Sequence, residues 1–452
     1  MLKMQMWKSR EKPILYLAFN KPIVEEAKQE ILAGDMPDWV SPRTFNSLGL
    51  GVLRDMTGHK CAPDTFKMSN LMKEEIRKFR KDDKDELEEA WTDIRQALGL
   101  AKHLGYIPDG YYKDVGRLCD RDALAARLDS QLSPLSWAVV DNVLLTSIKA
   151  AFAGSTDFDD QIYLPALWGG PFPGFPCVYV DEDQDLSPAN HAMLKRCMSE
   201  STRLCAVGDR YQSIYYFRGA ETNGVDKFKE NYSMKEMPLS ISFRCPSEIV
   251  RAVHWHVPNM KWFKDGGTYA SLQELEPGSI PDGAAIICRN NAPLFRAAFA
   301  LLHQRRSVRV AGSDIGPKII SLLQKIGSDA DTRDDLLIKI DAWRDEKLET
   351  ANNTATILDT AECLKLFASW GATLSQAIGY ARHLFAQQGS IELTTGHKAK
   401  GKEWDTVYHL DKWLLRDDDQ DANLKYVITT RAHETLYEIN TKDISWLLRP
   451  QG

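Results

Sequence analysis

The sequence has no C-x-x-C pair, and its eight cysteines are scattered along the chain. Cys177, Cys205 and Cys288 lie inside apolar, strand-like runs, so the cysteines are interpreted as small core residues in a reducing compartment, without disulfides or a zinc site. No apolar run approaches the roughly 18 residues needed to cross a bilayer. The N-terminal MLKMQMWKSREKP also lacks the apolar stretch of a signal peptide. These absences predict a cytoplasmic protein with no membrane segment.

The chain also lacks a strong excess of charge of one sign. Its formal net charge is −6 at pH 7, with 57 Lys and Arg against 63 Asp and Glu. This balance neither favours nor excludes nucleic acid as a partner, because the basic residues could still line a groove. With 452 residues, 43% of them hydrophobic, the chain has the composition of a globular protein and is too long for one hydrophobic core.

Alternating strand and helix patterns predict an α/β fold. Buried strands are predicted at 14–20, 178–180, 203–209, 390–395 and 405–410. Helical spacing follows the first of them, and residues 283–312 have a strand, helix, strand pattern. We therefore predict two parallel-sheet domains. The first is residues 1–238 with a helical insertion at about 60–150, and the second is residues 239–452 with a mainly helical insertion at about 330–385. The charged stretch 71–105 is interpreted as a solvated helical insert in preference to a direct binding element.

Four carboxylates follow one of these strands. In VYVDEDQDLSPAN, residues 178–190, they are Asp181, Glu182, Asp183 and Asp185. A run of acids is usually a solvated surface loop, but ligands bind at the carboxyl ends of buried parallel strands. At such a place one carboxylate can hold Mg²⁺ through its water shell and the next can polarise an attacking water, as nucleotide hydrolysis requires.

The next strand leads into a stretch of mixed chemistry, AVGDRYQSIYYFRGA at 206–220. Gln212 could sense a γ-phosphate, whereas Tyr215, Phe217 and Arg218 offer stacking surfaces for bases. The alternative is that both aromatic residues belong to the core.

These stretches resemble the motifs of the UvrD/Rep family of superfamily 1 DNA helicases, and the resemblance continues through the chain in the family's order. The similar segments are YLAFNKPIVEEA (16–27), TFNSLG (44–49), VDEDQD (180–185, the Walker B motif), VGDRYQSIYYFRGA (207–220), SFRCPSE (242–248), TTGHKAKGKEWDTV (394–407) and YVITTRAHETLY (426–437). The resemblance implies two RecA-like motor domains with helical insertions. Asp183 and Lys402 depart from the alanine and leucine that are more common in the family.

The resemblance also implies roles for individual residues, with ATP and Mg²⁺ as cofactors and single-stranded DNA as partner. At the nucleotide it places Asp181 (on the metal), Glu182 (on the attacking water), Gln212, Arg244 (at the γ-phosphate), Glu403 (at the sugar) and Arg431 (as an arginine finger). At the DNA it places Phe19, Asn20, Thr44, Tyr215, Phe217, Arg218, His397, Lys398 and Lys400. The alternative for Arg244 and Arg431 is a role in surface ion pairs.

The phosphate-cradling loop of the family, G-x-x-x-x-G-K-[ST], is missing before the strand at 14–20. Only MLKMQMWKSREKP precedes that strand, and it contains no glycine; the adenine-contacting glutamine motif is missing too. We therefore expect the chain to begin after this loop, with the loop carried by an upstream polypeptide, lost, or omitted by a late start. Two functions stay open: an ATP-dependent, 3′-to-5′ DNA helicase or translocase of a bacterial cell or phage-infected host, or a single-stranded DNA-binding protein derived from a helicase and without ATPase activity.

Overall fold

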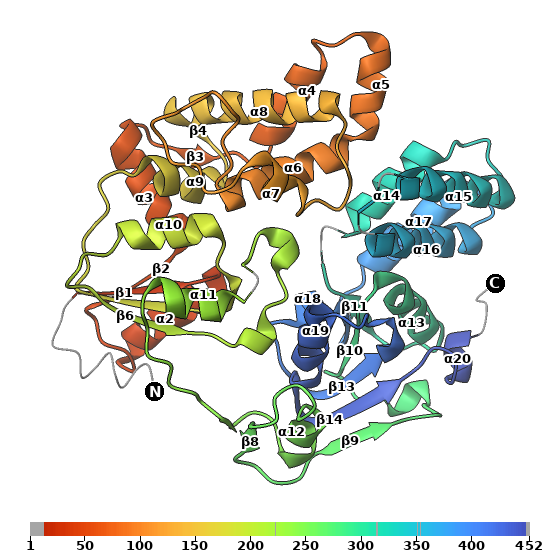
Figure 1. Ribbon diagram of the computed structural model, residues 1–452. Helices are drawn as coiled ribbons and strands as arrows, with labels where there is room; N and C mark the ends of the chain where they lie inside the picture. Colours follow the sequence, from red (N-terminus) through yellow and green to blue (C-terminus); the bar gives the residue numbers. More distant parts are fainter. Residues whose placement is uncertain (1–12, 222, 313–314, 350, 353, 449–452) are drawn as a thin grey trace. The chain divides into compact units, whose positions relative to one another are not determined.

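The computed structural model describes residues 13–221, 223–312, 315–349, 351–352 and 354–448 (Figure 1). Residues 1–12, which carry most of the segment that lacks the phosphate loop, lie outside the described residues. The chain divides into two compact units, Met1–Lys235 and Glu236–Gly452. Each unit is built around its own parallel sheet, which confirms the predicted α/β class with parallel sheets and many helices.

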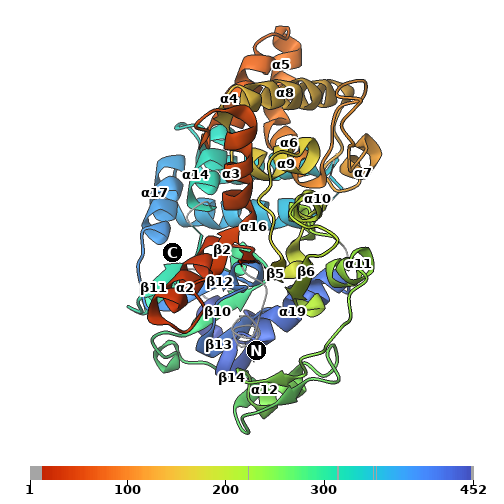
Figure 2. The same ribbon diagram turned by 90° about the vertical axis from the view of Figure 1, so that its left-hand side faces the viewer.

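The first unit contains a four-stranded sheet in the order β2-β1-β5-β6, with all neighbours parallel. Its strands are β1 (Ile14–Ala18), β2 (Val40–Thr44), β5 (Cys177–Asp181) and β6 (Arg203–Val207). The covering helices are α2 (Lys21–Ala33), α3 (Phe45–Thr57), α10 (Pro188–Arg196) and α11 (Gly224–Asn231). Since the strands are parallel, β1, β5 and β6 present their carboxyl ends at one edge of the sheet. The paired strands β5 and β6 are labelled in Figure 2.

Alternating side chains of β1 and β5 pack on opposite faces of this sheet. Leu15, Leu17, Val178 and Val180 form one core with α3 and α10. The intervening residues, Ile14, Tyr16, Cys177 and Tyr179, form another with α2. Both faces are buried, which is why these strands appear in the sequence as continuous apolar runs.

A helical insert separates β2 from β5 in the chain. Its elements are β3 (Ala62–Pro63), α4 (Lys67–Ile76), α5 (Lys81–Glu89), α6 (Trp91–Leu104), α7 (Arg121–Ala125), α8 (Pro134–Phe152), β4 (Ser155–Thr156) and α9 (Asp160–Trp168). The prediction that no apolar segment approaches membrane-spanning length is wrong on one point, because the 19-residue α8 is long and apolar enough. Half of that helix is buried in the unit, against α4 and α6 among others.

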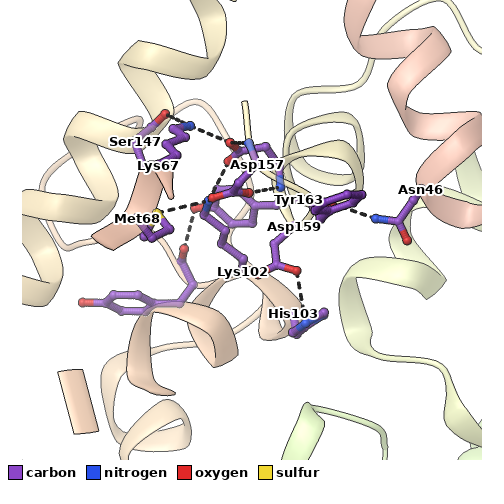
Figure 3. A network of polar contacts seen from close by, with 12 residues as sticks. Asn46, Lys67, Met68, Lys102, His103, Ser147, Asp157, Asp159 and Tyr163 are labelled. Atoms are coloured by element: carbon purple, nitrogen blue, oxygen red, sulfur yellow. Dashed lines mark hydrogen bonds and ion pairs between the residues drawn. The ribbon is translucent and has the colours of Figure 1, made fainter. Parts of the chain in front are cut away.

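The interpretation of 71–105 as a solvated stretch needs correction at Lys102. This side chain of α6 is 1% exposed, and its Nζ lies 2.5 Å from Asp157 and 2.7 Å from Asp160. Lys67 of α4 reaches the other oxygen of Asp160 at 2.5 Å. In Figure 3 the two lysines come from different helices and point toward Asp157 and its neighbours. The network balances two positive charges with two negative ones inside the insert, which is what allows them to be buried.

The second unit contains a six-stranded parallel sheet in the order β11-β12-β10-β13-β14-β9. Its strands are β9 (Thr268–Ser271), β10 (Ala285–Cys288), β11 (Val308–Val310), β12 (Ile391–Thr395), β13 (Trp404–Leu410) and β14 (Ala432–Ile439). The helices are α12 (Ser247–Ala252), α13 (Asn291–His303), α14 (Ile315–Ile326), α15 (Arg333–Glu349), α16 (Thr354–Trp370), α17 (Leu374–Phe385), α18 (Gly396–Ala399), α19 (Asp419–Thr429) and α20 (Ser445–Leu448). A separate strand pair joins β7 (Ile241–Ser242) to β8 (Lys261–Trp262).

Candidate functional site

The first part of the candidate site is the acidic end of β5. Asp181 ends the strand, and its carboxylate accepts a hydrogen bond from the hydroxyl of Tyr16 in β1 at 2.6 Å. The other oxygen accepts the backbone N–H of Glu182 at 3.1 Å. Burial, followed by the neighbouring Glu182 charge, raises the pKa of Asp181, although the Tyr16 bond opposes this. A nearby cation would favour the charged form of such a carboxylate.

The chain turns sharply after Asp181. Glu182 has a left-handed backbone with φ of 55°, and a 3-10 turn, η1 (Asp183–Asp185), follows. Asp183 is 5% exposed, and one of its oxygens has no hydrogen-bond partner among the described residues. Burial and the charges of Glu182 and Asp181 raise its pKa to about 6. A Cβ on Gly208 would lie 1.7 Å from this carboxylate, so any other residue at 208 would displace the Asp183 side chain.

Polar side chains connect the end of β5 to the end of β6. Gln184 donates to the Glu182 carboxylate, and its amide oxygen accepts the backbone N–H of Asp209 at 2.9 Å. Asp209 in turn accepts from the side chain of Gln212 at 2.9 Å; Gln212 ends the short turn η2 (Arg210–Gln212). The two predicted residues Glu182 and Gln212 are thus joined through two residues that the sequence reasoning missed. Asp209 lies two positions after the end of β6, close to where Asp181 ends β5, and this similar placement was the available signal.

Two carboxylates at this edge, Asp181 and Glu182, suit Mg²⁺, which is usually held by one or two carboxylates together with substrate phosphates. The described residues contain no group of three or more His, Cys, Asp or Glu side chains arranged to hold a metal by themselves. The donor set therefore fits an ion that shares its coordination with a nucleotide better than an all-protein metal site.

The second part of the site is a row of aromatic rings next to these acids. Phe19, just after β1, stacks on Tyr215 with centroids 6.0 Å apart and planes at 10°. Tyr215 contacts Phe217 edge-on at 6.1 Å. Phe217 is 45% exposed, so it is not a core residue. It lies in the 3-10 turn η3 (Tyr216–Arg218); the side chain of Arg218 falls outside the described part of the structure.

Two predicted DNA contacts have local structural roles. The side chain of Asn20 caps α2 by accepting the N–H of Ile23 at 3.1 Å. Thr44 caps α3 in a reciprocal arrangement with Ser47. Each cap puts the predicted residue at a helix N-terminus, where backbone N–H groups favour phosphate oxygens. Their contact with DNA stays a prediction.

In the second unit, Arg244 and Glu403 form an ion pair with each other. The second oxygen of Glu403 lies 2.7 Å from Nε2 of His433. The three side chains are between 34% and 39% exposed, so this cluster is open to solvent. Arg244 and Glu403, predicted to meet the γ-phosphate and the sugar, are brought together here.

Arg431 is 1% exposed. Its guanidinium donates to the carbonyls of Val427 and Lys402 and to the hydroxyl of Thr430. Burial and the nearby Arg244 charge lower its pKa to about 10. These bonds give Arg431 a structural role within its own unit, and its assignment as an arginine finger stays a prediction. His397 and Lys398 lie on α18 and Lys400 directly follows it, all three partly exposed.

Comparison with known proteins gives consistent matches. A family model described as the UvrD/REP helicase N-terminal domain matches residues 173–233, which include the acids at the end of β5 together with Tyr215 and Phe217. The chain is 26% identical over 262 residues to ATP-dependent DNA helicase PcrA of Bacillus subtilis, covering 54% of this chain and 33% of that protein. It is 29% identical over 273 residues to DNA helicase IV of Escherichia coli, covering 52% and 39%. It is 27% identical over 297 residues to F-box DNA helicase 1 of Gallus gallus, covering 58% and 29%.

The chain thus aligns with about a third of the length of these relatives. The matches agree with the parallel sheets of the fold. By sequence, the chain is therefore similar to DNA helicases of the UvrD/Rep family of superfamily 1.

Proposed function

We propose that this chain is the motor portion of an ATP-dependent DNA helicase or translocase that moves 3′ to 5′ on single-stranded DNA. One observation carries the proposal: β1 and the residue that follows it contact both the acidic part and the aromatic part of the site. Tyr16 donates to the acidic Asp181, and Phe19, three residues further, stacks on Tyr215 of the aromatic row. A shift of β1 relative to β5 would therefore affect the acids and the aromatic row together.

A second connection runs through side chains. Glu182, Gln184, Asp209 and Gln212 are hydrogen-bonded in series, and Tyr215 follows Gln212 by three positions. A change in the charge or hydration of Glu182 would reach the aromatic turn through three intervening residues. Such a short path supports coupling between nucleotide state and grip on DNA.

The proposed chemistry assigns distinct tasks to the carboxylates. Asp181 would hold Mg²⁺ through its water shell, and Glu182 would polarise the attacking water. The bound ion would neutralise charge on the phosphates. Arg244, Arg431 and Glu403 remain the proposed contributors of the second unit, and a phosphate would compete with Glu403 for Arg244.

The test is ATP turnover with and without a phosphate loop. Residues 1–452 contain no G-x-x-x-x-G-K-[ST] sequence, so we expect this polypeptide by itself to hydrolyse ATP negligibly. A supplied segment with such a loop, fused or in trans, should produce DNA-stimulated turnover on the order of 1 to 100 per second, a range taken from kinases. Glu182→Gln, or loss of Arg431, should abolish it. Turnover by residues 1–452 alone that Glu182→Gln removes would contradict the first expectation.

The alternative, a single-stranded DNA-binding protein without ATPase activity, is supported by the aromatic row alone, since stacking needs no nucleotide. It would be favoured if DNA binding depends on Phe217 while no supplied phosphate loop yields turnover.

A further inference from the structure

The turn that presents Phe217 is held from outside by the helical insert. Arg127, two residues beyond α7, is the main contact. Its backbone N–H donates to Leu124 at 3.0 Å, and its neighbours Leu124 and Leu128 are buried in the core of the insert. The backbone of Arg127 is thus positioned by the insert.

The guanidinium of Arg127 spans the turn. Its Nη2 donates to the carbonyl of Tyr216 at 2.6 Å and to the carbonyl of Ala220 at 2.8 Å. These carbonyls lie on either side of Phe217 in the chain. The guanidinium carbon also lies 3.5 Å from the centroid of the Tyr216 ring, a close cation–π contact. One side chain therefore fixes both ends of the turn and the ring between them.

The contacts with the turn offset the free-energy cost of burying the Arg127 guanidinium. Burial lowers the pKa of Arg127, and its Nε has no hydrogen-bond partner within the described residues. A guanidinium with a buried, unsatisfied N–H persists only where its other bonds offset the loss of water. The carbonyls of the turn supply those bonds, so the insert and the turn stabilise each other.

A second contact comes from α6. Gly219 has a φ of 90° and packs against His103, where a Cβ would lie 2.9 Å from the Cβ of His103. The Gly219 N–H donates to the Tyr216 carbonyl at 3.0 Å, so that oxygen accepts from both Gly219 and Arg127. A side chain at 219 would push the turn away from the insert.

We propose that Arg127 is a positioning residue for DNA binding, which holds the turn so that Phe217 extends the row formed by Phe19 and Tyr215. This inference rests on the proposed function, because it assumes that the row binds DNA. It assigns the insert a part in single-strand binding without contact between Arg127 and the nucleic acid.

The test is a double-mutant cycle with Arg127→Met and Phe217→Ala, measured by fluorescence anisotropy on a labelled oligo-dT. Arg127→Met keeps much of the side-chain length and removes the donors. We expect it to weaken binding by about three- to ten-fold, no more than the loss from removing one stacking ring. In the Phe217→Ala background it should cause no further loss, because the ring that it positions is absent. Arg117→Met, which removes an exposed arginine of the same insert, should bind like the parent.

A direct contact between Arg127 and a DNA phosphate would give the opposite pattern. The loss would persist in the Phe217→Ala background, Arg127→Lys would restore binding, and the salt slope would fall by roughly 0.7 in Arg127→Met. That result would overturn the inference. For a positioning role, Arg127→Lys should not restore binding, because an ammonium cannot reproduce the planar contact with the ring.

Hydrogen exchange without DNA provides an independent measurement. Amides of the 211–221 segment should exchange faster in Arg127→Met, while those of α10 stay unchanged. Tyr216→Ala, which removes only the ring, should give a smaller increase, and Tyr216→Phe none. If Phe217→Ala binds DNA like the parent, the proposed function fails, whatever the exchange shows. If Phe217→Ala binds weakly but Arg127→Met matches the parent in both measurements, only this inference is overturned.

Discussion

The ammonium of Lys402 lies 2.6 Å from a carboxylate oxygen of Glu392, a β12 side chain that is 6% exposed. Arg309 of β11 binds the second oxygen at 2.7 Å. Burial would raise the pKa of Glu392, but the bonds from Lys402 and Arg309 outweigh it and lower the pKa. Lys402 stands where the family more often has leucine. The structure explains this difference, because the positive charge of Lys402 pairs with the buried carboxylate of Glu392.

We expect Lys402→Leu to lower the free energy of unfolding by about 1 to 3 kcal/mol at pH 7, because a buried acceptor loses one of its two donors. The folded pKa of Glu392 is depressed, so its contribution is present above the unfolded pKa and is lost as the pH falls through the folded value. The deficit of the variant should therefore shrink toward acid. Urea denaturation from pH 8 down to about pH 3, below the unfolded pKa of a glutamate, measures this.

Lys264→Leu is the matched control for Lys402, because the Lys264–Glu434 pair is 3.6 Å long and more than half exposed. Its effect should stay within about 0.5 kcal/mol. Equal stability of Lys402→Leu and the parent at pH 7 would show that Glu392 does not need this partner.

Lys102→Met should destabilise the first unit much more strongly. It leaves Asp157 without its lysine and Asp160 with Lys67 alone, inside the insert. Breaking a buried pair in this way costs about 3 to 5 kcal/mol. Thermal or urea unfolding measures the change, and Lys81→Met, on the exposed start of α5, is the control. A loss below about 1 kcal/mol would mean that the carboxylates are protonated or reach water.

Phe217→Ala should weaken binding of single-stranded DNA by about ten-fold or more, with little dependence on base sequence, because one stacked base contributes roughly 1 to 3 kcal/mol. Fluorescence anisotropy measures the affinity and circular dichroism checks the fold. Phe66→Ala removes a 69% exposed phenylalanine from the insert of the same unit and should bind like the parent. Unchanged affinity in Phe217→Ala with an intact fold would remove the basis for a DNA groove.

Lys398 and Lys400 are expected to act through charge. Replacing either with methionine should lower the slope of log affinity against log salt by roughly 0.7 for a single strand, whereas Phe217→Ala should leave that slope unchanged. A salt titration of all three variants separates electrostatic from stacking contributions. An unchanged slope in both lysine variants would place these side chains away from the DNA backbone.

The sheets were predictable because parallel strands buried on both faces leave continuous apolar runs. The run at 14–20 became β1 and the run at 203–209 became β6. The acids after β5 could also be located, since the carboxyl ends of such strands carry ligands. The apolar runs and the residues directly after them were sufficient to predict the strands and the acidic end of β5.

Partners far apart in sequence were not predictable. Lys102 belongs to a charged stretch that has the pattern of a solvated helix, yet its two acids lie 55 and 58 positions away. Arg431 was assigned from its motif, which does not indicate that its guanidinium also donates to the carbonyl of Lys402, 29 positions away. Hydrophobic periodicity predicts which face of a helix is buried. It does not predict which distant residue will pair with a charged side chain of that helix.

The hydrogen bond from Arg127 to the Tyr216 carbonyl joins positions 89 residues apart. Exchange of the insert between related proteins could therefore break this bond. An insert transplanted from a relative that lacks a basic residue at this place would leave the Tyr216 and Ala220 carbonyls without their donor, even if its helices folded well. We expect positions 127 and 216 to vary together across relatives. Chimaeras that exchange one of these residues without the other should bind single-stranded DNA more weakly while they still fold.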